Sequence, residues 1–286
     1  MATGNPPLHL SPRRKPFPWT RTILLVLVVA TVLLTIFPFL WLIQMSLKTG
    51  IDAFLMPPKL LFLPTLQNYL DLLEGKFMRS FWNSTVVGVS TSLISLLLGV
   101  PAAYALSRAG FRHAQGFSLW ILTTRMAPPI AFGIPFFLAY RTLGLIDTKI
   151  GLIIIYLTFN LSLVIWMMRT FFDGLPRSLE EAACIDGASI VDTFLRIVLP
   201  LSAPGLATTA IFCFLFAWND FFYALILTRS GSMTAPVAIV NFMNYEGWEW
   251  GKITAGGSVI MIPVVVFSLL VRNYLIRGLT AGAVKN

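Results

Sequence analysis

Polar side chains that could perform specific chemistry are scarce in this sequence, and one group of them interrupts long apolar runs. Arg125 lies in one such run, and Asn219, Asp220 and Tyr223 lie in another. A charge inside lipid costs at least about 2.5 kcal/mol, so such residues usually face a cavity or a partner. Aromatic faces with amide and carboxylate groups would suit a polyhydroxylated solute. The sequence leaves two interpretations open: these four residues line a translocation pathway, or they pack the spans, with Arg125 paired to Asp220.

A second group of polar residues forms a loop at about 169–202. Ser178 and Glu181 have the spacing of a capping box, in which each side chain bonds the backbone N–H of the other residue. This pattern predicts a helix over about 179–186 that stops at Gly187, because glycine accepts the left-handed terminating conformation at little cost. Ser189 and Asp192 predict a second cap, for a helix that reaches Pro200. Its apolar residues follow helical spacing and form one face: Ile190, Phe194, Ile197 and Val198.

The elements that position these residues must lie in a membrane. The chain has 286 residues, of which 57% are hydrophobic and 12% charged, whereas soluble domains carry roughly a quarter charged residues. Six apolar runs approach the roughly 20 residues that a spanning helix needs, and they are continuous, unlike the alternating strands of a barrel. We therefore predict an all-α integral membrane protein with six transmembrane helices, at 22–45, 82–106, 117–140, 150–168, 203–227 and 254–276.

The third of these runs should be interrupted. Pro128, Pro129, Gly133 and Pro135 follow Arg125 closely, and proline removes a helical hydrogen bond and clashes with the preceding turn. A broken span is tolerated only where it lines protein or a water-filled cavity. The domain organisation that follows is a tail over 1–21, a membrane domain over 22–276 that contains the loop 169–202, and a tail over 277–286.

Charge predicts orientation and excludes several functions. The cluster Arg13-Arg14-Lys15 before the first span favours a cytoplasmic N-terminus, and six spans then place both termini in the cytoplasm. The net charge of +9 comes without a basic stripe, so nucleic acid is not the expected partner. His9 and His113 are too few and too dispersed for a metal site. No Walker A motif occurs, because both Gly-Lys pairs, Gly75-Lys76 and Gly251-Lys252, lack the required flanking residues.

The polar loop carries a resemblance to a known family. Glu181-Ala182-Ala183, then Gly187, then Ile197-Val198-Leu199-Pro200, with their spacing, resemble the EAA signature of ABC-importer permeases. Asp186-Gly187-Ala188, Trp218-Asn219-Asp220-Phe221 and the segment Arg277–Lys285 resemble the carbohydrate-importer, MalG-like branch. The resemblance implies that the loop is a cytoplasmic coupling helix seated in an ATPase subunit, through Glu181, Ala182, Ala183, Asp186, Gly187, Leu199 and Pro200. It also implies that the C-terminal residues Gly278, Thr280, Gly282 and Lys285 contact the ATPases.

The function implied is that of a permease subunit in a binding-protein-dependent importer for a sugar, sugar alcohol or related solute. The partners implied are two ATP-binding cassette ATPases, a second permease (a MalF-like chain) and an extracytoplasmic solute-binding protein, in the inner membrane of a bacterium. The chain itself would hold no cofactor, and ATP and Mg²⁺ would bind the partner subunits. Two rivals are an ion-coupled carrier, which would need more ionisable midplane residues and a repeat, and a membrane enzyme, which would need a catalytic cluster.

Overall fold

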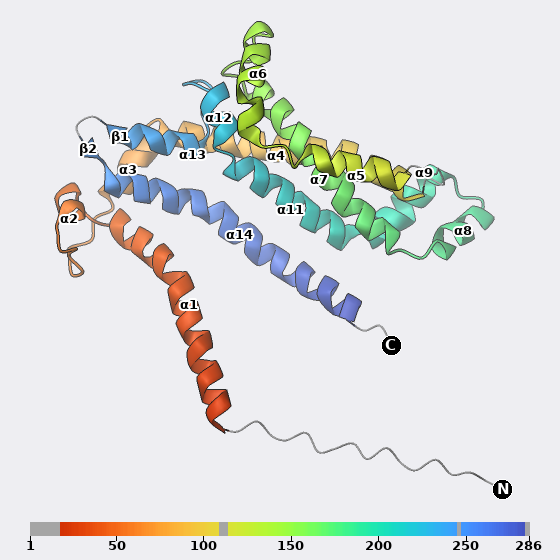
Figure 1. Ribbon diagram of the computed structural model, residues 1–286, viewed down its shortest axis with the longest axis horizontal. Helices are drawn as coiled ribbons and strands as arrows, with labels where there is room; N and C mark the ends of the chain where they lie inside the picture. Colours follow the sequence, from red (N-terminus) through yellow and green to blue (C-terminus); the bar gives the residue numbers. More distant parts are fainter. Residues whose placement is uncertain (1–17, 109–113, 245–246, 284–286) are drawn as a thin grey trace.

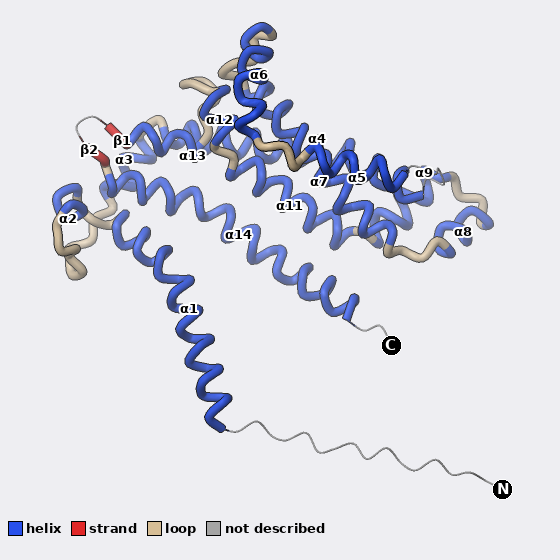
Figure 2. Tube along the Cα trace, in the orientation of Figure 1, coloured by secondary structure: helices blue, strands red, loops and turns tan. Residues whose placement is uncertain are grey.

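A computed structural model describes residues 18–108, 114–244 and 247–283, and most of them are helical. In this part of the chain, strands are confined to a hairpin of β1 (Met243–Asn244) and β2 (Gly247–Trp248), shown in red in Figure 2. The helices, labelled in Figure 1, are α1 (Pro18–Ser46), α2 (Gly50–Phe54), α3 (Gln67–Glu74), α4 (Phe77–Arg108), α5 (Ala114–Thr124), α6 (Pro129–Thr142), α7 (Lys149–Asp173), α8 (Ser178–Ile185), α9 (Ile190–Thr193), η1 (Phe194–Val198), α10 (Leu199–Leu201), α11 (Ala203–Asn219), α12 (Phe222–Leu227), α13 (Ala235–Ala238), η2 (Ile239–Phe242) and α14 (Trp250–Ala283).

Four of these helices, α1, α4, α7 and α14, are long and apolar enough to cross a membrane alone. Two bent pairs bring the number to six when each pair counts as one span: α5 with α6, and the run 190–201 with α11. Helices satisfy their own backbone hydrogen bonds, which a lipid environment demands. The predicted all-α membrane fold is confirmed.

The predicted break in the third span is also confirmed. α5 and α6 meet at an angle of 78°, and Pro128 has the extended conformation between them. The prolines explain the bend, since neither Pro128 nor Pro129 can donate a helical hydrogen bond.

The predicted fifth span, 203–227, is not one continuous helix: its bounds enclose α11 and α12, which are separated by a break. α11 ends at Asn219, because Asp220 has an extended backbone, with φ −65° and ψ 128°. The Asp220 side chain accepts the backbone N–H of Ala224, at 3.1 Å, and so caps the next helix, α12. At its other end α11 bends by 77° from the helical run 190–201. α11 thus begins at the predicted residue, and the segment breaks at Asp220.

The core of the bundle is the crossing of α4 and α7, onto which α11 packs. Gly99 of α4 lies against Val164 of α7, so closely that a β-carbon at Gly99 would lie 2.7 Å from a Val164 methyl. The buried cluster around this crossing comprises Val100, Ala103, Leu163, Val164, Met168, Phe172, Val198 and Cys213. Close packing at a small residue replaces the hydrophobic effect, which does not drive helices together in lipid.

α1 stands apart from this core. Figure 1 shows its C-terminal end beside α14 and its N-terminal half diverging from the bundle. No residue of its most apolar stretch is buried within this chain. Such a surface is stable only against lipid or another membrane protein.

The two ends of the bundle differ. α2, α3 and the β1–β2 hairpin lie at one end, and α8 and α9 project from the other (Figure 1).

The chain termini were predicted to form tails. Residues 1–17 of the predicted N-terminal tail lie outside the described residues. α14 extends to Ala283, beyond the predicted end of the last span at residue 276.

We predict that Gly99→Ala lowers the thermal stability of the protein in detergent or nanodiscs. The new methyl group would overpack the α4–α7 crossing, which typically costs about 1–3 kcal/mol. Gly116→Ala in α5 is the matched control, because a β-carbon there meets nothing within 4 Å. Equal melting temperatures for the two variants would contradict the packing described for Gly99.

Candidate coupling surface and transmembrane cavity

The first candidate site is α8 with the turn that follows it. The helix ends close to the predicted point, and Gly187 has φ +84°, a left-handed conformation that L side chains rarely adopt. The predicted capping box at Ser178 is wrong: Ser178 is already helical, and Arg177 precedes it without a side-chain cap. A tight turn starts the helix instead, in which the N–H of Leu179 bonds Pro176 O and that of Glu180 bonds Arg177 O.

The predicted second cap is confirmed. The Ser189 hydroxyl accepts the backbone N–H of Asp192 at 3.1 Å and donates to the Asp192 carboxylate at 2.6 Å. α9, η1 and α10 then follow without interruption to Leu201, and η1 is a widened π-helical turn. Within this chain Ile190 is 73% exposed, whereas Val198 is buried. A widened turn shifts the register of side chains around the helix axis, so a regular helical period fails across it.

Two adjacent carboxylates of α8 point in different directions. Glu180 lies against α4, where it accepts hydrogen bonds from the Tyr104 hydroxyl at 2.8 Å and from Arg108 Nε at 2.7 Å. Burial raises the pKa of Glu180, but these hydrogen bonds and the Arg108 charge outweigh it, so the pKa is lowered overall. The sequence analysis missed the role of Glu180, whose partners lie on a distant helix.

The other motif residues of α8 form a solvent-facing surface. Glu181, Ala182, Asp186 and Gly187 are exposed, and only Ala183 of the predicted set on this helix is buried, at 6% exposure. Apolar side chains flank them: Ile185 is 87% exposed and Val191 64%. Leu199 is half-buried and Pro200 exposed, at the base of the projection. We call this projection, residues 178–191, the coupling knob.

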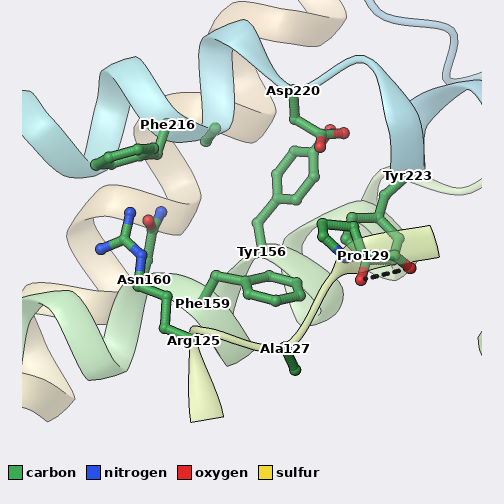
Figure 3. A pocket seen from close by; sticks show the side chains of 10 residues that line it. Arg125, Ala127, Pro129, Tyr156, Phe159, Asn160, Phe216, Asp220 and Tyr223 are labelled. Carbon is green, nitrogen blue, oxygen red and sulfur yellow. Dashed lines mark hydrogen bonds between the residues drawn. The ribbon is translucent and has the colours of Figure 1, made fainter. Parts of the chain in front are cut away.

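The second candidate site is a cavity of about 200 Å³ at the two helix breaks. Three of the four predicted pathway residues line it, namely Arg125, Asp220 and Tyr223. Asn219 does not; its side chain is exposed. The remaining lining residues are Ala127, Pro129, Tyr156, Phe159, Asn160, Phe216 and Ala217, most of them shown in Figure 3.

The polar groups of this cavity have different partners from those proposed. Among the described residues Arg125 forms no ion pair with Asp220; its guanidinium lies 4.1 Å from the centroid of the Phe216 ring (Figure 3). Asp220 instead accepts a hydrogen bond from the Tyr156 hydroxyl at 2.8 Å. The Asn160 amide donates to Cys213 O at 3.1 Å. The cavity thus offers a cation, a carboxylate and phenol hydroxyls beside aromatic faces, groups that bind hydroxylated solutes by hydrogen bonding and stacking.

No metal or C-terminal site can be assigned from the geometry. In the described part of the chain, no three His, Cys, Asp or Glu side chains gather as a metal ion would require. Gly278, Thr280 and Gly282 lie in the last turns of α14, and Lys285 lies outside the described residues.

Comparison with known proteins decides the family. Residues 95–280 match the family described as binding-protein-dependent transport system inner membrane component. The chain belongs to this family of transport permeases. The resemblance predicted from residues 181–200 is therefore confirmed, and the chain is not an enzyme but a subunit of a transporter.

Relatives of the permease cover nearly its whole length. The trehalose transport system permease protein SugB of Mycobacterium tuberculosis (strain CDC 1551 / Oshkosh) is 41% identical over 255 residues, which are 87% of this chain and 92% of SugB. The trehalose/maltose transport system permease protein MalG of Thermococcus litoralis is 34% identical, over 93% of this chain and 97% of MalG. A solved bacterial ABC transporter involved in the import of alginate has a chain that superposes with a TM-score of 0.75 at 29% identity, over 91% of this chain and 99% of that chain.

We predict that Asp220→Ala destabilises the permease. The substitution leaves the buried Tyr156 hydroxyl and the Ala224 N–H without their acceptor, at a cost of about 1–3 kcal/mol. Asn219→Ala is the matched control at the neighbouring, exposed position. Melting temperatures in detergent report both variants, and an equal loss would show that the Asp220 contacts do not hold the break.

The two cysteines of the permease provide a test of the coupling knob without any substitution. Cys184 on α8 is exposed, and Cys213 on α11 is fully buried. A hydrophilic maleimide should modify one thiol per native chain, at Cys184, and the second only after unfolding. Peptide mass spectrometry identifies the site. Labelling of Cys213 in the native protein, or protection of Cys184 in the isolated chain, would contradict the described burial.

Proposed function

We propose that this chain is the transmembrane permease subunit of an ABC importer that brings a sugar, sugar alcohol or related polyhydroxylated solute into the cell. The observation that carries the proposal is the family match over 95–280 together with the exposed motif residues of the coupling knob. The solute class is supported by the names of the relatives, which transport trehalose, maltose or alginate. The aromatic and hydrogen-bonding groups of the cavity fit that class.

The coupling knob would be the point at which the permease receives energy. Its exposed face combines carboxylates, small residues and apolar side chains, a composition that fits a cleft in a protein better than it fits water. Two ATPase subunits of the importer would bind ATP and Mg²⁺, close, and move the knobs of two permeases. We place both termini, the knob and the residues Gly278, Thr280, Gly282 and Lys285 on the cytoplasmic side with the ATPases.

Transport would follow from alternating access. A solute-binding protein delivers its cargo at the opposite end, where α2, α3 and the β1–β2 hairpin lie, and a second, MalF-like permease completes the pathway. ATP shifts the equilibrium between the inward-open and outward-open states of the permeases, because the ATP-bound ATPases bind one of these two states better. The cavity at Arg125 and Asp220 would contact solute as it passes.

The direct test is reconstitution of the permease with its ATPases, second permease and binding protein in proteoliposomes. Uptake of a labelled sugar or polyol that the binding protein binds should require internal ATP. Uptake driven by an ion gradient without ATP would instead establish a secondary carrier. ATP-driven uptake of amino acids but not of hydroxylated solutes would retain the importer and reject the solute class.

We predict that Gly187→Val uncouples this importer. A β-branched residue cannot adopt φ +84° without strain, so the end of α8 would change direction and the knob would no longer fit its partner. The expected result is at least tenfold less uptake with normal membrane insertion. Gly174→Val is the matched control, since Gly174 lies in the same loop with φ −79°. Equal uptake by the two variants would contradict the role of Gly187.

A further inference from the structure

The coupling knob is held to the membrane bundle by side chains as well as by the backbone. The chain joins α8 to its neighbours through two short links, and each contains a glycine, Gly174 or Gly187. The turn at Gly187 sets the direction of the chain after α8. The contacts that Glu180 makes with α4 add a side-chain attachment between α8 and the bundle.

Those contacts are strong and shielded. Glu180 receives the Tyr104 hydroxyl on one oxygen and Arg108 on the other, with an Arg108–Glu180 ion-pair distance of 2.5 Å. The two charged side chains are only 16% and 15% exposed. Hydrogen bonds between charged groups are stronger than neutral ones, and partial burial protects them from screening. The Tyr104 ring also packs on Phe172 of α7 and on Phe194 of η1.

The polar contacts continue across the bundle from Arg108. Arg108 donates to the Ser107 hydroxyl at 3.0 Å, and that hydroxyl donates to the Asp173 carboxylate of α7 at 2.5 Å. The other oxygen of Asp173 pairs with Arg169 at 3.4 Å, one turn earlier on α7. Arg169 in turn donates to the hydroxyl of Ser118 on α5. These side chains form an unbroken polar relay from α8 through α4 and α7 to α5.

The relay ends on α5, the helix that leads directly to Arg125 in the cavity lining. Ser118 and Arg125 are seven residues apart, about 10 Å along a helix axis. α5 continues to Thr124, and the Arg125 N–H still bonds Leu122 O in the last turn. A displacement of α5 at Ser118 is thus passed to Arg125 by one rigid element. Beyond Arg125 the chain bends by 78° into α6, so α5 ends at the cavity as an element separate from α6.

We propose that Glu180 is a positioning residue for transport: through Tyr104, Arg108, Ser107, Asp173 and Arg169 it fastens the coupling knob to α5, so that closure of the ATPases repositions Arg125 in the cavity. The inference rests on the proposed function, because it needs the knob to receive an ATP-driven movement. Glu181, its exposed neighbour, faces the partner, and Glu180 faces the bundle. Two adjacent carboxylates therefore divide the roles of docking and transmission.

The test uses the complete transporter in proteoliposomes and measures solute imported per ATP hydrolysed. Glu180→Gln keeps the shape and removes the charge, and Tyr104→Phe removes one donor only. Both should lower the ratio at least fivefold, the lower end of typical coupling between sites, while the ATPases still co-purify and hydrolyse ATP. The charge exchange Glu180→Arg with Arg108→Glu should recover part of the ratio. Arg196→Gln is the matched control, since its ion pair with Asp192 lies in the same loop but Arg196 is 81% exposed.

A second readout separates transmission from mere stability. Ala127→Cys places a thiol in the cavity lining, in a Cys184→Ser background. Its labelling rate should change on ATP addition in the parent and stay constant in Glu180→Gln. An unchanged import ratio and an ATP-responsive thiol in Glu180→Gln would overturn the relay. Absence of ATP-driven uptake in the parent transporter would instead refute the proposed function itself.

Discussion

A backbone that crosses lipid must hydrogen-bond to itself, and the functional geometry of this protein follows from where it departs from that rule. The described membrane segments break at Pro128 and at Asp220, and both breaks border one cavity. The freed groups find partners there: Asp220 accepts the Ala224 N–H, and the Tyr223 hydroxyl donates to Pro129 O at 3.5 Å. Because such partners are polar, the two breaks bring polar side chains into the middle of the bundle.

The coupling end likewise depends on contacts with the rest of the bundle. α8 is too short to be stable alone, and it is held by Glu180 on one side while its other side remains exposed. A helix with one anchored and one free face can receive force from a soluble partner and deliver it to a membrane bundle. The permease family match over 95–280 covers both the cavity and the coupling knob, so the two sites lie within the segment that defines the family match.

The sequence predicted those features that local rules control. The stop at Gly187, the cap at Ser189 and the proline break after Arg125 each depend on residues within one turn of the position concerned. The membrane class followed from continuous apolar runs. The spacing of the EAA-like residues predicted the family that the match over 95–280 confirms.

The features that the sequence could not give depend on distant partners. The side that Glu180 faces is set by Arg108, 72 residues earlier, and the break at Asp220 is stabilised by Tyr156, 64 residues earlier. Ser178 does not cap α8 as predicted, because a turn from Pro176 and Arg177 starts the helix one residue earlier. Asn219 is adjacent to Asp220 in the sequence, but its side chain is exposed at the end of α11, and only Asp220, in the extended break, reaches the cavity.

The central claim is that the exposed face of α8 is the surface on which an ATPase acts. The most direct measurement is photo-cross-linking from a benzoylphenylalanine that replaces Ile185, a residue 87% exposed at the end of α8, in the assembled transporter. The account predicts that the ATPase subunit is captured and that ATP changes the yield. Failure to capture the ATPase in an assembled, ATP-hydrolysing complex would contradict it.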